Sequence, residues 1–131
     1  MSFRRLLLLW GLVVLWMGLI FYLSSIPNLS VASGVLDFWT RKPAHIGEYT
    51  VLFLLILKAV LGSFGIEWKL WKTSVVAAVL TLLYAVSDEV HQLFVPTRAG
   101  RVMDLGFDFL GILVGFFLSY LIRLRIRRKL D

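Results

Sequence analysis

Cysteine is absent from this chain of 131 residues, proline occurs three times, and charged residues make up only 17% of it. Without cysteine the chain has no disulfide framework, no thiolate metal site and no cysteine nucleophile. Soluble domains usually carry about 25% charged and about 45–50% apolar residues. Because 60% of this chain is hydrophobic, the shortage of charge indicates a protein that resides in lipid.

The hydrophobic residues fall into four long stretches. The first contains 18 consecutive residues without a charge, and a run of that length is typical of a membrane-spanning helix. A cleaved signal peptide is the alternative, since Arg4 and Arg5 precede the run, but the apolar part of a signal peptide has only about 7–15 residues. The sequence predicts an all-α fold, an integral membrane four-helix bundle forming one domain over 1–131, with spans at 6–23, 44–61, 73–95 and 103–122.

The segment before the second span carries two further signals. Residues 35–39 are amphipathic and contain Trp39, so we expect them to lie along the membrane interface. Pro43 suits the first turn of a helix, where its missing N–H is not needed. We therefore expect the second helix to begin close to Pro43.

Basic residues are shared unevenly between the two sides that four spans define. If the N-terminus is cytoplasmic, ten lysines and arginines lie on the inner side and four on the outer side, namely Arg41, Lys42, Arg98 and Arg101. The positive-inside rule favours this orientation, which places both termini in the cytoplasm. Because the basic clusters flank apolar runs, the net charge of +6 indicates membrane anchors, and we expect no nucleic-acid binding.

Most of the polar residues within the spans fall near their predicted outer ends. Residues three, four and seven apart share one helix face. The faces that result are Lys42, His45, Tyr49 and Leu52 in the second span, Tyr84, Asp88 and Gln92 in the third, and Asp104, Asp108, Gly111 and Gly115 in the fourth, with Glu48, Glu89 and His91 on the flanks. A charge at membrane depth costs at least ~2.5–3.5 kcal/mol. We therefore expect the three faces to meet in one site, with Lys42 and Arg98 compensating the carboxylates, while the glycine pair serves helix packing or dimerisation.

These residues also resemble a known family. The motifs are Lys42-x-x-His45-x-x-x-Tyr49, Ser87-Asp88-Glu89-x-x-Gln92, Pro96-x-Arg98 and Asp104, and with Ser24-Ser25-x-Pro27 they resemble the VanZ-like family over residues 21–115. The chain departs from that pattern at Asp108, where the family usually has Asn. The resemblance implies a small multi-pass protein of the bacterial inner membrane that acts on the cell envelope, in a family named for resistance to the glycopeptide teicoplanin.

Four functions for the site are open at this stage. One is a purely structural network. Another is binding or modification of a lipid or lipid-linked phosphate, for which the ligand-binding candidates are Lys42, Tyr49, Gln92, Arg98, Arg101, Asp104 and Asp108. The third is an enzyme acting on a lipid phosphate or ester, with His45, Glu89, Asp88 and Arg98 as catalytic candidates. A proton or solute pathway is disfavoured, because the inner halves of the spans hold few polar residues besides Lys58 and Thr81.

The enzyme hypothesis assigns a role to each candidate. His45 is the general base or nucleophile, Glu89 the general acid or base, and Arg98 the group that stabilises developing negative charge. The only cofactor that the residues suggest is a divalent cation, and its candidate ligands are Asp88, Asp104 and Asp108.

Overall fold

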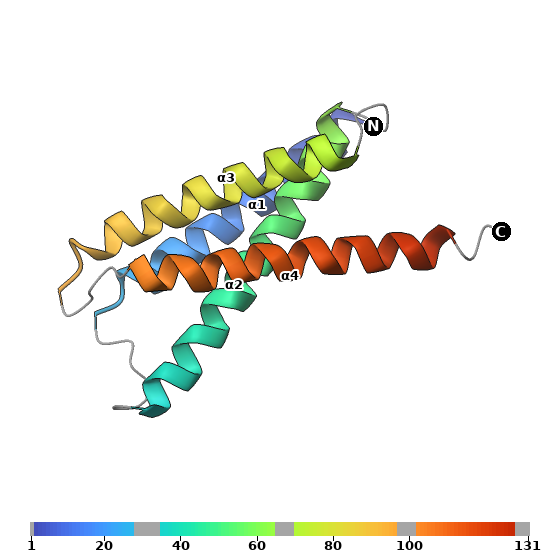
Figure 1. Ribbon diagram of the computed structural model, residues 1–131. Coiled ribbons are helices and arrows are strands. Elements are labelled where there is room, and N and C mark those ends of the chain that lie inside the picture. The colour runs from blue at the N-terminus through green and yellow to red at the C-terminus, as the bar shows by residue number, and fades with distance from the viewer. Residues whose placement is uncertain (1, 28–34, 65–69, 97–101, 128–131) are drawn as a thin grey trace.

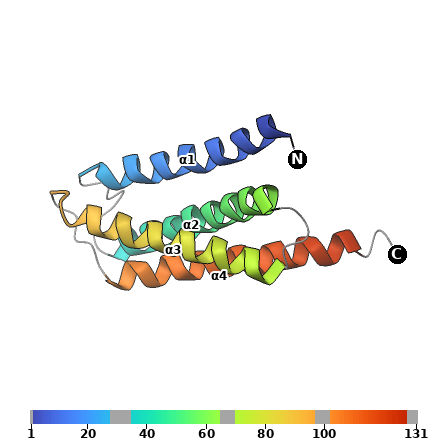
Figure 2. The same ribbon diagram turned by 90° about the horizontal axis from the view of Figure 1, so that it is seen from above.

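The computed structural model describes residues 2–27, 35–64, 70–96 and 102–127. They form four helices, α1 (Phe3–Ser25), α2 (Val35–Phe64), α3 (Leu70–Gln92) and α4 (Val102–Arg127). Successive helices run in opposite directions, so that α1 begins and α4 ends at the same end of the bundle (Figures 1 and 2). Each helix contains a stretch long and apolar enough to cross a membrane. The predicted all-α, four-helix architecture of a membrane protein is confirmed.

The start of the second helix differs from the prediction. Helix α2 begins at Val35 and has Pro43 in its interior, so the expectation of a helix that starts near Pro43 is wrong. A proline inside a helix removes one backbone hydrogen bond, to the carbonyl four residues earlier. Membrane helices tolerate that loss when their surroundings satisfy the freed group.

The third helix ends three residues earlier than expected. It stops at Gln92, and the chain then turns through successive hydrogen bonds from the N–H groups of Leu93, Phe94 and Val95 to carbonyls three residues back. Pro96 follows. The apolar composition of 93–95 had suggested a longer span, but the residue before a proline is disfavoured in the α conformation.

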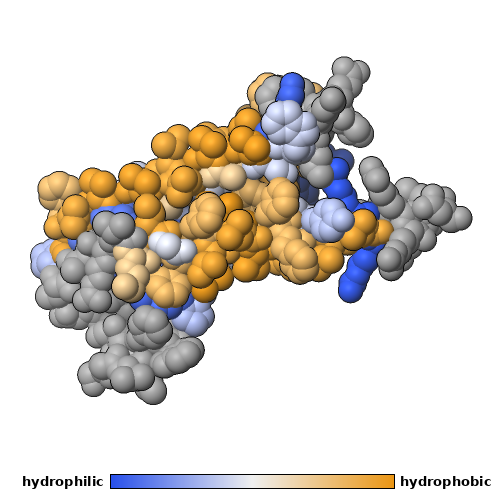
Figure 3. Space-filling model, viewed as in Figure 1, coloured by the Kyte–Doolittle hydropathy of each residue, from blue (hydrophilic) through white to orange (hydrophobic). Residues whose placement is uncertain are grey.

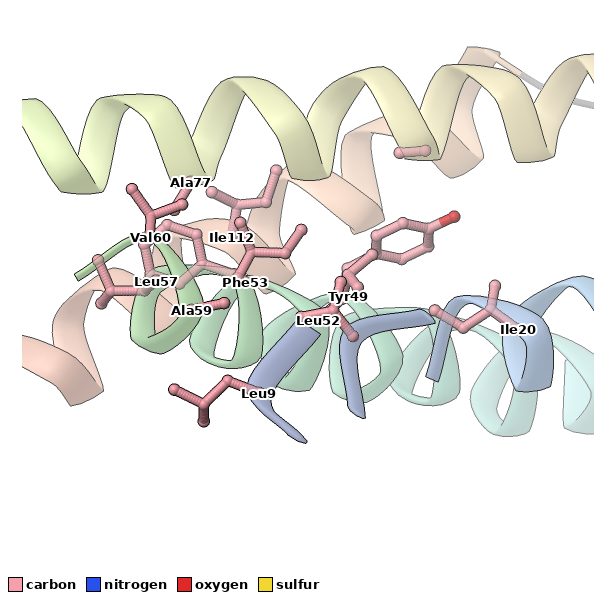
Figure 4. Packing of buried hydrophobic residues seen from close by; sticks show 13 residues of the cluster. Leu9, Ile20, Tyr49, Leu52, Phe53, Leu57, Ala59, Val60, Ala77 and Ile112 are labelled. Atoms are coloured by element: carbon pink, nitrogen blue, oxygen red, sulfur yellow. The ribbon is translucent and has the colours of Figure 1, made fainter. Parts of the chain in front are cut away.

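Helix α2 is the centre of the bundle. It packs against all three other helices, most extensively against α4, whereas α1 has no contact with α4 in the part of the chain described here. Figure 4 shows the buried side chains of α2 meeting Ile20 of α1, Ala77 of α3 and Ile112 of α4. The face of the molecule drawn in Figure 3 is hydrophobic over its middle, with hydrophilic residues toward the two ends. Such an apolar exterior is suited to lipid.

Two glycines allow α2 and α4 to approach closely. A Cβ atom on Gly111 would lie 2.6 Å from the carbonyl oxygen of Ile46, and one on Gly115 would lie 2.7 Å from the ring of Phe53. The Thr50 hydroxyl donates a hydrogen bond of 2.9 Å to the carbonyl of Gly111. Of the two roles expected for this glycine pair, packing within one bundle is therefore observed.

We predict that Gly111→Ala destabilises the bundle, because the added methyl group meets backbone of α2 that cannot move independently. Overpacking of this kind typically costs about 1–3 kcal/mol. The measurement is the free energy of unfolding in detergent, followed by circular dichroism.

The matched control is Gly106→Ala on the same helix, where a Cβ meets nothing within 4 Å. Alanine has the higher helix propensity, so this variant should be as stable as the parent protein or slightly more stable. Equal stabilities of the two variants would contradict the close approach of α2 and α4 at Gly111.

Candidate functional site

Buried polar side chains from all four helices gather where α1 and α3 end and α2 and α4 begin, and we call this the polar end. It lies opposite the beginning of α1 and the end of α4 (Figure 1). The polar side chains there that are less than a tenth exposed are Ser24, His45, Asp88, Gln92, Asp104 and Asp108. The faces expected from helix spacing thus do point into the bundle, and their polar ends come together.

The first part of the site is an ion pair between α2 and α4. The ammonium group of Lys42 contacts Asp104 Oδ1 directly, and the two side chains are 12% and 2% exposed. The Lys42 amine also lies 5.0 Å from the centre of the Phe107 ring. The carboxylate partner expected for Lys42 is therefore that of Asp104.

The second part is a cluster of His45, Glu89 and Asp108, which come from α2, α3 and α4. His45 Nδ1 lies 2.9 Å from Asp108 Oδ1, and one potential metal-ligating atom from each of the three residues lies within 4.8 Å of the others. Within the described residues, Asp108 Oδ2 has no hydrogen-bond partner although it is buried. The cluster combines one imidazole with two carboxylates, a set that can transfer a proton or hold a cation.

The third part is centred on Asp88 and joins α3 to α1. Asp88 Oδ2 accepts hydrogen bonds from the Ser24 hydroxyl at 2.9 Å and from Gln92 Nε2 at 2.8 Å. The buried atoms Asp88 Oδ1, Gln92 Oε1 and the Tyr49 hydroxyl have no partner among the described residues. Figure 4 shows the Tyr49 ring extending from α2 toward α3. Within the described part of the polar end, these buried polar atoms are therefore left without a hydrogen-bond partner.

His91 makes its described contacts with α1. Its Nε2 lies 3.0 Å from the Ser25 hydroxyl, and its ring stacks on that of Phe21 with the ring centres 4.3 Å apart. It is not a member of the cluster of His45, Glu89 and Asp108. This histidine joins two helices at the edge of the site.

The structure separates three residues that the sequence analysis had grouped as possible ligands of one cation. The proposed metal ligands Asp88, Asp104 and Asp108 do not form one ligand set among the described residues, because Asp104 pairs with Lys42 and Asp88 with Ser24 and Gln92. Arg98 and Arg101 lie outside the described residues.

Two contributing residues were not assigned a role from the sequence. Ser24 donates to Asp88, and Thr50 donates to the carbonyl of Gly111. The available signal for each was a hydroxyl inside or at the end of an otherwise apolar helix, where its hydrogen bond must be made within the protein.

The polar end is acidic in its described part. From Lys42 onward it holds one lysine, two histidines and five carboxylates, which are those of Glu48, Asp88, Glu89, Asp104 and Asp108. Buried carboxylates need a counter-charge or several hydrogen-bond donors. Asp88 and Asp108 each keep one buried oxygen without a partner among the described residues, and a cation or a group rich in N–H and O–H donors is suited to those two oxygens.

Comparison with known proteins identifies a family that matches the chain. The family described as VanZ/LLP1 matches residues 9–123, a range that includes the whole polar cluster from Ser24 to Asp108. None of the curated proteins and none of the solved structures matches the chain.

We predict that Lys42→Met lowers the free energy of unfolding by about 3–5 kcal/mol, because it leaves the buried carboxylate of Asp104 without its cation. Replacing both partners, as Lys42→Met with Asp104→Leu, should restore most of the loss, since well-packed apolar residues often substitute for a buried ion pair. The measurement is unfolding in detergent.

Lys72→Met is the control, because Lys72 is exposed and lies beside Trp71 at the other end of α3. Its effect should be small. If the double variant is no more stable than Lys42→Met, the loss does not arise from an unpaired Asp104.

Proposed function

Since this chain belongs to the VanZ/LLP1 family and is a multi-pass membrane protein with four apolar helices, we propose that it binds a membrane lipid or lipid-linked cell-envelope precursor at its polar end. The headgroup contacts the polar cluster, and the acyl or prenyl tail lies along the apolar exterior of the bundle. We propose that the protein resides in the bacterial inner membrane.

The observation that carries this proposal is the surplus of buried acceptors. Asp88 Oδ1 and Gln92 Oε1 find no donor among the described residues. A buried polar atom left without a partner costs about 1–3 kcal/mol. A ligand that supplies donors, such as the hydroxyl groups of a sugar or the ammonium group of a headgroup, removes that cost.

The phosphate of such a ligand needs positive charge from elsewhere, because Lys42 is paired with Asp104. Arg98 and Arg101 follow α3 in the sequence and lie outside the described residues. Their guanidinium groups are suited to phosphate, which they can bind through two parallel hydrogen bonds. We assign the phosphate to these two arginines and the rest of the headgroup to the buried acceptors.

The distribution of basic residues supports a site on the outer face of the membrane. The described basic residues away from the polar end are Arg4, Arg5, Lys58, Lys72, Arg123, Arg125 and Arg127. By the positive-inside rule that opposite end is cytoplasmic. The polar end then faces the compartment in which the cell envelope is assembled, and a change in glycopeptide susceptibility is one expected consequence of its action there.

We predict that Arg98→Ala weakens binding of a short-chain prenyl phosphate by at least about tenfold, the loss expected when a charge-assisted hydrogen bond worth about 1.5–3 kcal/mol is removed. The measurement is native mass spectrometry or fluorescence titration of the purified protein in detergent.

The matched control is Arg123→Ala, which removes an arginine near the far end of α4 and should leave the affinity unchanged. Equal affinity of Arg98→Ala and the parent protein would reject the assignment of the phosphate to Arg98.

A second candidate function, catalysis on a lipid phosphate or ester, is favoured by the contact between His45 and Asp108. Their 2.9 Å separation is that of a general base and the carboxylate that orients it. Glu89 lies within the same cluster and is suited to the complementary role of proton donor. The three residues have the chemistry of an acid–base site.

If the protein is an enzyme, His45→Ala and Glu89→Gln should each lower turnover of a labelled lipid phosphate by about 10²–10⁴-fold, the usual contribution of a general acid or base. Product formation is followed by thin-layer chromatography, with His91→Ala as the control that removes a histidine outside the cluster. Full turnover in His45→Ala would exclude this mechanism.

A further inference from the structure

We propose that His45, Glu89 and Asp108 bind a divalent transition-metal cation such as Zn²⁺. The three side chains come from α2, α3 and α4, and one potential ligand atom of each lies within 4.8 Å of the other two. His45 Nδ1 and Asp108 Oδ1 are already 2.9 Å apart. The site requires no lipid, so it goes beyond the proposed function.

A separate observation points to a ligand here. Asp108 is completely buried, with 0% of its surface exposed, and its Oδ2 has no hydrogen-bond partner among the described residues. Carboxylates of folded proteins rarely leave a buried oxygen unpaired unless an ion or an unlocated ligand accounts for it. A cation that joins the cluster of His45, Glu89 and Asp108 supplies the missing partner.

The charge balance of the cluster also favours a divalent cation. The carboxylates of Glu89 and Asp108 bring two negative charges, which a divalent cation and a neutral His45 imidazole neutralise completely. The nearest described lysine, Lys42, contacts the Asp104 carboxylate instead. Because net charge is costly at membrane depth, a divalent cation suits this ligand set better than a monovalent or a trivalent one.

The donor set selects the type of cation. Imidazole nitrogen suits zinc and its neighbours in the first transition row, whereas Ca²⁺ takes six to eight oxygen ligands. Zinc sites that keep an open position have three protein ligands at about 2.0–2.2 Å. Three protein ligands are the number that the cluster of His45, Glu89 and Asp108 supplies.

The backbone around the site is held in place on the α2–α4 side. Gly111 lies one turn after Asp108 and packs against the backbone of α2, where the Thr50 hydroxyl is bonded to its carbonyl. This packing fixes the helices that carry His45 and Asp108 relative to one another. Two of the three ligands are therefore preorganised, as tight metal binding requires.

The experiment measures metal binding directly, without lipid or substrate. Full-length protein is purified in detergent, freed of its affinity tag, stripped with a chelator and titrated with Zn²⁺ by calorimetry, while Co²⁺ is followed by its visible absorption. We expect one Zn²⁺ per chain. His45→Ala and Asp108→Asn should each weaken the affinity at least about tenfold, and His91→Ala should leave it unchanged.

Two results would overturn the proposal of a metal site. One is a parent protein that takes up neither Zn²⁺ nor Co²⁺, and the other is an affinity that Asp108→Asn does not lower. Asp108→Asn keeps the shape of the side chain, and circular dichroism of this variant establishes that a loss of affinity is not a loss of fold. Displacement of Zn²⁺ by equimolar Mg²⁺ would overturn the choice of a transition metal. None of these results depends on whether the protein binds a lipid.

Discussion

Side chains of α2 that meet the buried carboxylates of α4 are the constraint on which the rest of the bundle depends. Asp104 and Asp108 are buried in α4 and would be very costly in lipid, but Lys42 and His45 meet them from α2. These contacts require the two helix axes to be close, and Gly111 permits that approach because it presents no side chain to α2. Charge pairing and close packing therefore require each other.

The remaining helices are added to this pair through weaker polar contacts. Helix α1 is mostly exposed to lipid, and what joins it to the others includes hydrogen bonds from Trp16 to the carbonyl of Glu48, from Ser24 to Asp88 and from Tyr84 to the carbonyl of Met17. A purely structural network would satisfy each of its buried atoms in this way. The polar end does so for one oxygen of Asp88 and leaves the other without a donor among the described residues. That difference is our reason for proposing a binding site and not a packing device.

The sequence predicted the faces of the helices well and their pairing poorly, for a physical reason. Helical periodicity identifies which residues of one helix lie together, so the burial of His45, Asp88 and Asp108 followed from spacing alone. It carries no information on how far one helix slides along another. That axial register decides that Lys42 meets Asp104, and it depends on contacts such as that of Gly111 with α2.

Helix direction places the carboxylates of α3 and α4 in different electrostatic surroundings. Helix α4 begins at the polar end with Asp104 in its first turn, where the partial positive charge of a helix N-terminus stabilises an acid. Helix α3 ends there, so Asp88 and Glu89 lie near a helix C-terminus, where the dipole disfavours negative charge. Asp88 is compensated by the hydrogen bonds of Ser24 and Gln92. Positive charge placed beside Glu89 has the further effect of opposing the α3 dipole, so a cation in this position stabilises the end of that helix as well as the carboxylate.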